Sequence, residues 1–347
     1  MEAEGLLAID IGGGTQDILL YRPGVPVENC VQLIVPAPTV LVAEEIARAT
    51  AARRPVFLRG NLMGGGASVR AVRQHLEAGL AVYATPLAAK TVFDDLSRVE
   101  VLGVKLAETA PEAMPVELRD VDLPRLARAL SVYGITLPRA VAVAVQDHGE
   151  SIGMSNRLFR FRHWEEFLER DARLEGLVYT RENLPPYLTR MAAVLRDVPH
   201  ALVMDTVAAA FWGALEDETV RRHTAAGVIL LNVGNQHTTA ALYREGVLYG
   251  LFEHHTRLVT PAKLATWIEG LRAGTLTHAE IFDSGGHGAC FRPDYTPGEG
   301  FRFLAVTGPR RELARGLNCY FAAPYGDMML TGCFGLVAAW KKQQGFA

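Results

Sequence analysis

An apolar run that leads into an aspartate and three glycines, close to the start of the chain, restricts the fold more than any other stretch. Residues 7–21 read Leu-Ala-Ile-Asp-Ile-Gly-Gly-Gly-Thr-Gln-Asp-Ile-Leu-Leu-Tyr. The apolar runs on both sides of the glycines predict a strand, a tight turn and a second strand. Glycines let backbone N–H groups surround an anion, and a carboxylate at a strand end can hold a divalent cation or its water. The stretch therefore predicts a site for phosphate and magnesium.

Two widespread phosphate-binding loops do not fit this stretch. A P-loop requires Gly-Lys followed by Ser or Thr at the start of a helix, and the chain contains no such triplet. A dinucleotide-binding loop requires a third glycine and a following helix, but Asp17 occupies that position and a β-prone run follows. The order of elements therefore excludes both loops.

The same pattern returns later in the chain at a constant offset of 222 residues and without gaps. In residues 227–246, Asn232 takes the place of Asp10 and Gly234 the place of Gly12, and both copies end in Tyr-Arg-x-Gly. Chance similarity between two hydrophobic hairpins is the alternative explanation. Two copies of one strand–turn–strand unit predict a duplicated domain in which a phosphate loop from each half faces a shared cleft.

The rest of the chain alternates between strand-like and helix-like segments, which predicts an α/β architecture of mixed sheets flanked by helices. We expect strands at residues 29–35, 56–58, 80–86, 140–145 and 201–204. We expect helices at residues 39–53, 68–78, 93–103 and 123–133, and helical spacing over residues 157–200 that is broken by two prolines.

Length and composition are those of a soluble protein with two domains. The 347 residues suffice for two cores, and we place the boundary between residues 204 and 205, with helical insertions in the first domain. A net charge of −3 predicts no general attraction to nucleic acid or membranes. The acidic start of the chain lacks the basic region of a secretory signal, and four scattered cysteines indicate reduced thiols, so we expect a cytoplasmic protein.

Five segments together resemble motifs of the superfamily of actin, sugar kinases and heat-shock-chaperone ATPases, whose two ribonuclease-H-like domains close on a nucleotide. Residues 10–17 resemble its first phosphate motif and residues 232–238 its second. Residues 205–213 resemble the connecting helix, residues 305–310 the adenosine motif and residues 328–340 the closing helix. The resemblance implies two such domains that bind ATP and Mg²⁺ in the cleft between them.

The chain is also similar to a branch of this superfamily whose members are sometimes labelled pyruvate formate-lyase activating proteins. A radical activase needs three cysteines spaced C-x-x-x-C-x-x-C for an iron–sulfur cluster, and the four cysteines here have no such spacing. The sequence therefore excludes that chemistry. Another type of activase couples ATP hydrolysis to electron delivery from a cluster that bridges two subunits, and this type stays as a minor alternative.

The resemblance assigns roles to individual residues. Asp10 would hold magnesium through water. The residues that would bind phosphate are Gly12, Gly13, Gly14, Thr15, Gln16, Asn232, Gly234, Asn235, Gln236, His237 and Thr238. The residues that would bind adenosine are Gly308, Pro309 and Arg310.

Asn232 departs from the family pattern, which commonly has aspartate there. Asparagine forms hydrogen bonds but supplies no negative charge to a cation. This weakens the case for rapid hydrolysis more than the case for nucleotide binding. An ATPase or a kinase-type phosphotransferase is the expected function, with a small molecule or a protein as the acceptor. A nucleotide-gated binding protein without turnover is the alternative, and a homodimer is left open.

A cluster of ionisable residues after the strand at residues 140–145 supplies candidates for a general base. Asp147 is the first choice, and His148 or Glu150 the second, although a polar loop that caps the next helix would have the same composition. Asp205 would orient water or metal, or would serve as the N-cap of a helix, and the two roles are compatible.

The histidines of the second half invite a metal interpretation, which the spacing does not support. His254 and His255 are adjacent on a β-prone run, so their side chains point to opposite faces. His287 and Cys290 lie further on, and no fourth ligand has a suitable spacing. We therefore expect packing or a polar loop at these positions.

Overall fold

The opening hairpin lies at the centre of a six-stranded sheet in a computed structural model of the chain, which describes residues 5–298 and 300–345. The strand order is β3-β2-β1-β8-β10-β9, and its strands are β1 (Leu6–Ile11), β2 (Thr15–Tyr21), β3 (Val31–Pro36), β8 (Ala140–Val145), β9 (Val178–Tyr179) and β10 (Leu202–Met204). β1 runs antiparallel to β2, with Asp10 opposite Asp17, and parallel to β8. Both neighbours of β1 place polar residues at the same end of the sheet.

The second sheet repeats this arrangement. Its order is β14-β13-β12-β11-β15-β16, and its strands are β11 (Val228–Val233), β12 (His237–Arg244), β13 (Val247–His255), β14 (Gly288–Phe291), β15 (Phe303–Thr307) and β16 (Tyr320–Phe321). The amide of Gly12 donates to the carbonyl of Thr15 at 2.9 Å, and the amide of Gly234 donates to that of His237 at 2.9 Å. β11 runs parallel to β15, as β1 runs parallel to β8. The predicted duplication and the α/β class are confirmed.

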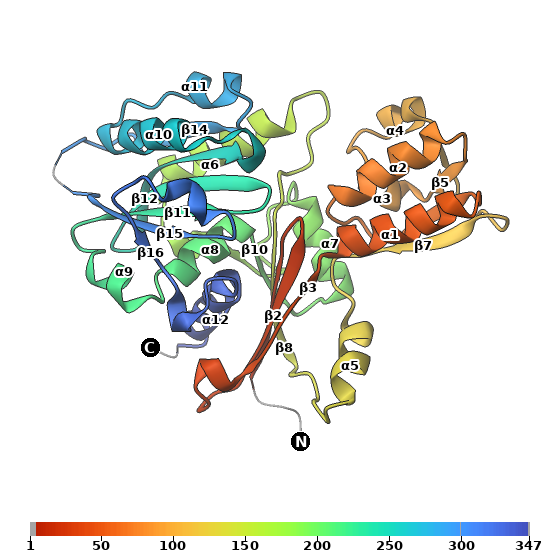
Figure 1. Cartoon of the computed structure of the whole chain (residues 1–347), viewed down its shortest axis with the longest axis horizontal. Coiled ribbons are helices and arrows are strands. Elements are labelled where there is room, and N and C mark those ends of the chain that lie inside the picture. The colour runs from red at the N-terminus through yellow and green to blue at the C-terminus, as the bar shows by residue number, and fades with distance from the viewer. Residues whose placement is uncertain (1–4, 299, 346–347) are drawn as a thin grey trace.

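A subdomain inserted between β3 and β8 carries a sheet of its own. Four parallel strands have the order β6-β5-β4-β7, with bounds β4 (Val56–Gly60), β5 (Val82–Ala84), β6 (Val104–Leu106) and β7 (Met114–Leu118). Helices α1 (Pro38–Ala51), α2 (Ala67–Glu77), α3 (Pro86–Ala89) and α4 (Leu96–Leu102) accompany it. Figure 1 shows this subdomain on the right and the second half of the chain on the left.

The sequence predicted helical insertions in this part of the chain, whereas the structure has helices together with a separate four-stranded sheet. The sequence predicted β4 and β5 of this sheet, and it missed the two edge strands, β6 and β7. The longer of the two is β7. It lies at the edge of the sheet, where Val116 and Leu118 are buried and Pro115 and Glu117 are exposed. A proline and a glutamate in a run of five residues are typical of a connection, and only the pairing with β4 makes them part of a strand.

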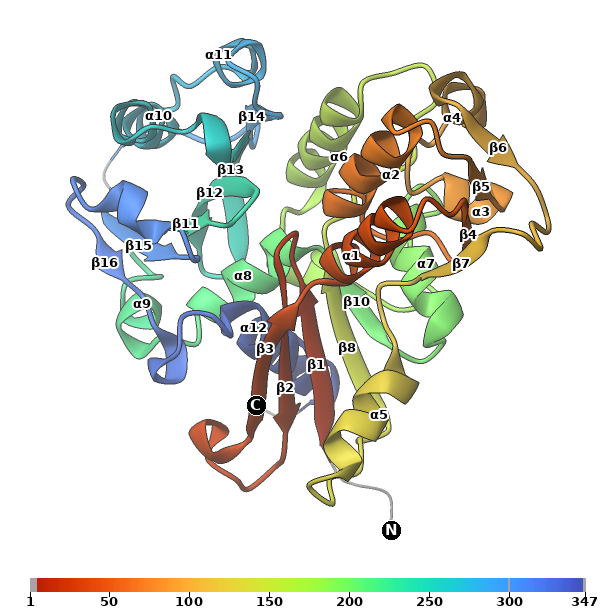
Figure 2. The ribbon, with the colours of Figure 1, turned by 45° about the vertical axis from the view of Figure 1, so that its right-hand side comes forward.

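Two helices join the halves beneath the hairpins. α8 (Thr206–Ala214) follows β10, and α12 (Thr331–Gln343) returns from the second half to pack against α8 and β1 (Figure 2). A Cβ atom on Gly213 would overlap the carbonyl of Thr331, and one on Gly335 would overlap the carbonyl of Ala209. The absence of side chains at these two glycines allows the helix backbones to touch.

The remaining helices surround the two large sheets. They are α5 (Leu123–Ser131), α6 (Asn156–Arg170), α7 (Thr189–Asp197), α9 (Glu218–Arg222), α10 (Pro261–Ala273) and α11 (His278–Asp283). The expected domain boundary falls between β10 and α8 and stays a prediction. Across the described residues, every helix is too short or too polar to cross a membrane.

The packing of α8 against α12 predicts a large effect of a small substitution. Gly335→Ala should lower the free energy of unfolding by about 1–3 kcal/mol through overpacking, although alanine is normally favoured over glycine in a helix by about 1 kcal/mol. Urea denaturation would measure the change. Gly316→Ala is the control because a Cβ there meets open space, and equal stability of both variants would contradict the close approach.

Candidate functional site

The two glycine turns face each other across the cleft between the halves. Gly13 lies so close to the side chain of Gln236 that a Cβ atom would overlap it, and Gly14 faces Asn235. This meeting divides the cleft into two pockets that share Gly12, Gly13, Gln236 and His237 in their walls. We call the pocket that contains Asp10 and Asn232 the loop pocket, and its volume is about 110 Å³. We call the pocket that contains residues 64–66 the subdomain pocket, and its volume is about 240 Å³.

The loop pocket collects most of the residues that the sequence assigned to nucleotide and magnesium. The assigned residues in its wall are Asp10, Gly12, Gly13, Thr15, Asn232, Gly234, Asn235, Gln236, His237, Gly308 and Pro309. Both phosphate motifs and the glycine of the adenosine motif therefore meet at one place. Segments more than 200 residues apart supply the two turns, so this convergence depends on the pairing of the halves.

Two carboxylates lie side by side in this pocket. Asp10 and Asp17 are directly opposite each other on β1 and β2, and each has a buried Oδ1 atom without a hydrogen-bond partner. Burial and the neighbouring Asp17 and Asp205 raise the pKa of Asp10 well above its usual range. Burial also raises the pKa of Asp17 to about 7. Like charges on opposed strand positions repel, so the pair favours a cation or a proton.

The equivalent pair in the second half carries no charge. Asn232 lies opposite Thr239, and its Oδ1 accepts a 3.4 Å hydrogen bond from the hydroxyl of Thr307. Gly308 has a φ of +96°, and its amide donates to the sulfur of Met328 at 3.1 Å. The acidic side of the loop pocket thus belongs to the first hairpin alone.

The subdomain pocket lies on the other side of the Gly13–Gln236 contact. Gly64, Gly65 and Gly66 from the subdomain line it, together with Lys90 and Arg190. Both cations are paired: Lys90 with Glu150 at 2.5 Å and Arg190 with Asp120 at 2.8 Å.

Asp147 lines this pocket, but its carboxylate is occupied by backbone groups. Oδ1 accepts from the amide of Gly149 and Oδ2 from the amides of Arg190 and Met191, each at 2.9 Å. Burial raises the pKa of Asp147 to about 6. These bonds hold the loop after β8 against the start of α7, which is the capping role that the sequence left open beside general-base catalysis.

Asp205 caps α8 and is bound to a buried arginine on α6. Its Oδ1 accepts from the amide of Val207, and both its oxygens accept from the guanidinium of Arg160 at 2.9 and 3.1 Å. Arg160 also donates to Glu253 at 2.6 Å, and it is only 5% exposed. The burial of Arg160 could have been predicted from the helical periodicity of α6, because Arg160 and Trp164 are four residues apart and share the buried face of the helix.

Six assigned residues lie outside both pocket walls, and one of them is Asp205. Gln16 donates to the carbonyl of Pro36, Thr238 is buried against Thr256, and Arg310 is an exposed partner of Glu312. Gly14 faces Asn235, which lines the loop pocket. Glu150 pairs with Lys90, which lines the subdomain pocket. His148 lines the subdomain pocket.

The raised pKa of Asp17 predicts a specific pH dependence of stability. Between about pH 4 and pH 7 the unfolded chain loses this proton while the folded chain retains it, so the contribution of Asp17 to stability falls as the pH rises. Above pH 7 the penalty is complete, at about 4 kcal/mol, since one pKa unit corresponds to about 1.4 kcal/mol. Asp17→Asn should therefore gain stability over the wild type across this range.

Chemical denaturation at pH 5, 6, 7 and 8 would measure the difference. Asp283→Asn, which alters an exposed carboxylate, serves as the control and should follow the wild type. A constant difference between Asp17→Asn and the wild type at all four values would show that Asp17 titrates normally.

Solved structures of similar shape cover nearly the whole chain. A protein from Bacteroides thetaiotaomicron, described as having an actin-like ATPase fold and unknown function, is 7% identical, with 96% of each chain covered and a TM-score of 0.40. A chain of the PilM–PilN type IV pilus biogenesis complex is 12% identical, with 99% of each chain covered and a TM-score of 0.43. The ethanolamine utilization protein EutJ from Carboxydothermus hydrogenoformans is 12% identical over 96% of this chain and 88% of its own, with a TM-score of 0.33.

Because these TM-scores are below 0.5, the assignment of the fold rests on the repeated sheet topology of the chain itself. That topology is the two-domain actin-like ATPase arrangement expected from the sequence. No curated protein matches the sequence significantly. One family model matches residues 63–313, which is more than half of the chain. The chain therefore belongs to the family described as "Putative pyruvate format-lyase activating enzyme (DUF1786)".

Proposed function

We propose that the protein binds Mg–ATP in the cleft between its halves and acts on the γ-phosphate, as an ATPase or a phosphotransferase. The observation that carries the proposal is the buried pair of Asp10 and Asp17, with unpartnered oxygens, between two matching glycine turns. An uncompensated pair of carboxylates next to backbone N–H groups suits a divalent cation with its phosphate.

The residues that line the loop pocket suit Mg–ATP in composition. Asp10 and Asp17 would hold Mg²⁺, directly or through water, while the turns at Gly12 and Gly234 would face the phosphates. Gly308 and Pro309 would face the adenosine. When bound, the ion would neutralise phosphate charge and orient the γ-phosphate. The protein's own contribution would be positioning, because no cationic side chain is among the described residues that line the loop pocket.

Nucleotide binding requires the halves to move apart. The loop pocket, at about 110 Å³, is smaller than the roughly 300–1,000 Å³ of typical small-molecule sites. Gln236 lies across the first glycine turn, so separation of Gly13 from Gln236 would join the loop pocket to the subdomain pocket. An acceptor or water in the subdomain pocket would then lie next to the phosphate.

Two observations favour a second candidate, a nucleotide-gated binding protein that does not turn over. Asn232 supplies no charge at the position equivalent to Asp10. The carboxylate of Asp147, the first candidate for a general base, already accepts three backbone hydrogen bonds. In this alternative, nucleotide would control the separation of the halves and thereby the surface offered to a partner.

The positions of the four cysteines do not favour the activase chemistry that the family description names. Cys30 directly precedes β3, Cys290 lies in β14, Cys319 precedes β16 and Cys333 lies in α12. Cys30, Cys290 and Cys333 are buried on separate elements, and Cys319 is only partly exposed. An ATP-dependent activator with a cluster between two subunits would have to use Cys319, and it stays the weakest of the three proposals.

Calorimetric titration of ATP with Mg²⁺ tests the proposed site. Asp10→Asn should weaken binding by at least tenfold, because it removes a cation ligand while preserving shape, and tenfold corresponds to about 1.4 kcal/mol. Gln16→Ala alters the same hairpin but neither pocket, and it should bind like the wild type. Equal affinity of Asp10→Asn and the wild type for ATP would contradict the assignment of Asp10 to the binding site.

Measurement of phosphate release separates the two main candidates. Release that depends on Mg²⁺ and Asp10, alone or with an added metabolite pool, would support the enzyme. Tight binding without release under any of these conditions would support the nucleotide-gated protein.

A further inference from the structure

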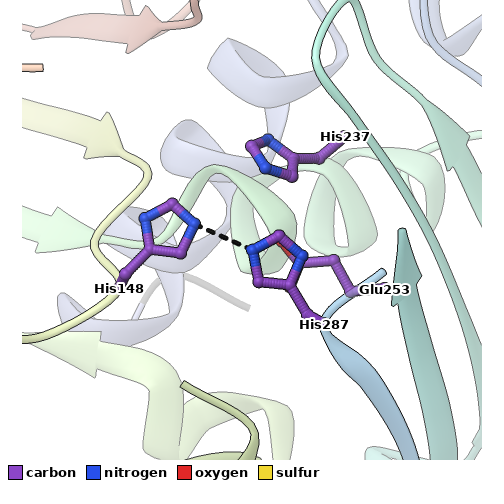
Figure 3. Close-up of side chains that lie close together, drawn as sticks. All are labelled: His148, His237, Glu253 and His287. Atoms are coloured by element: carbon purple, nitrogen blue, oxygen red, sulfur yellow. Dashed lines mark hydrogen bonds and ion pairs between the residues drawn. The ribbon is translucent and has the colours of Figure 1, made fainter. Parts of the chain in front are cut away.

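Four side chains converge at the floor of the subdomain pocket: His148, His237, Glu253 and His287. We call them the histidine cluster. One donor atom from each residue lies within 4.8 Å of a donor atom from every other (Figure 3). The imidazole rings belong to different elements and approach one another from three sides. The sequence separates them so widely that their spacing gave no indication of a site.

Both halves of the molecule contribute to the cluster. His148 lies in the loop after β8, in the first half, whereas His237 begins β12 and Glu253 lies in β13. His287 immediately precedes β14. The predicted alternation of adjacent histidines is observed, since His254 bonds to Ser284 while the ring of His255 lies 4.7 Å from that of His287.

The distance between two of the imidazoles suits a shared metal ion. Nε2 of His148 lies 3.1 Å from Nε2 of His287. Two ligand nitrogens at about 2.0–2.1 Å from one ion are separated by about 2.8–3.4 Å at angles between 90° and 110°. A hydrogen bond between the two neutral rings would give a similar distance, so the remaining polar atoms decide between the explanations.

A hydrogen bond between His148 and His287 leaves another buried nitrogen unsatisfied. Nε2 of His237 is buried and has no hydrogen-bond partner in the described structure, and an ion shared with His148 and His287 would give it one. Such atoms are rare in native proteins and indicate an ion or a water. Burial disfavours the charged form of all three rings and lowers their pKa. A neutral imidazole has a lone pair for coordination.

The carboxylate of the cluster is fixed in place by its neighbours. Glu253 is completely buried and accepts from Arg160 at 2.6 Å and from Gln146 at 2.9 Å. Burial by itself would raise its pKa, but the adjacent guanidinium of Arg160 lowers the pKa below its usual range. Arg160 is shared with Asp205, so one buried cation faces two carboxylates and leaves negative charge beside the imidazoles.

We propose that the histidine cluster is a binding site for one divalent transition-metal ion, such as Zn²⁺ or Fe²⁺. Nitrogen donors with one carboxylate favour these ions, whereas Mg²⁺ and Ca²⁺ prefer oxygen ligands alone. Hydrogen bonds that orient a ligating carboxylate are typical of such sites, and Arg160 and Gln146 supply them. The site is separate from Asp10 and Asp17 and does not rest on nucleotide binding.

The site opens toward the subdomain pocket. His148 and His237 line that pocket and are partly exposed, whereas Glu253 and His287 lie behind them. An ion bound there faces the pocket on the side of His148 and His237, and four protein ligands are the number typical of structural Zn²⁺ sites. Because His148 and the other three ligands belong to different halves, a bound ion ties the halves together in the closed arrangement.

Metal titration of the full chain, freed of any affinity tag and treated with chelator, tests the proposal. Calorimetry with Zn²⁺, and visible absorption with Co²⁺ as the probe, should give one site per chain, whereas Mg²⁺ should not compete. His148→Gln and His287→Gln should each weaken binding by at least about 100-fold, since loss of even an outer hydrogen bond costs 10–100-fold. His200→Gln, which alters an exposed histidine, is the matched control and should bind like the wild type.

Thermal unfolding provides a second readout. Zn²⁺ should raise the melting temperature of the wild type and of His200→Gln, because ligands that bind only the folded chain stabilise it, and should not raise that of His148→Gln. His148 is partly exposed and lies in a loop, so this variant tests the site even where His287→Gln does not fold. Absence of stoichiometric binding by the wild type, or unchanged binding by His148→Gln, would overturn the proposal.

Discussion

The arrangement of the cleft depends on one buried guanidinium. Arg160, on α6, forms ion pairs with Asp205 at the start of α8 and with Glu253 on β13, and it also donates to the carbonyl of Asp147. It therefore joins the two sequence halves at the point where the hairpins face each other. Removing one partner of a buried ion pair typically costs about 3–5 kcal/mol, because the other charge is left uncompensated. Arg160 therefore holds the loop after β8, the start of α8 and β13 next to one another.

The cleft contains two chemically different surfaces. On one side of the Gly13–Gln236 contact, Asp10 and Asp17 form an all-oxygen acidic pair whose pKa values are raised by burial. On the other side, imidazoles surround Glu253, whose pKa lies below its usual range. The first surface suits a hard cation with phosphate and the second a softer ion with nitrogen ligands. The contact between Gly13 and Gln236 lies between the two surfaces.

The fold followed from local patterns to a large extent, and the site only in part. Asp10, Gly12, Asn232 and Gly234 were located by the repeat because strand–turn–strand units are encoded by neighbouring residues. Thr238 and Gln16 belong to the same hairpins but face away from the pockets, since alternate strand residues point to opposite faces. Asp147 was placed in the correct loop, yet its carboxylate is occupied by amides of α7, which lies some 43 residues further along the chain.

The sequence by itself determined the two hairpins and the α/β class, because each depends on hydrophobic periodicity and glycines within short segments. Only the tertiary structure decided the burial of Arg160 and the assembly of His148, His237, Glu253 and His287. These residues come from separate segments, with His148 and His287 139 positions apart, and they become neighbours because both large sheets pack against α8. Ligands that meet through domain packing leave no spacing in the sequence by which to recognise them.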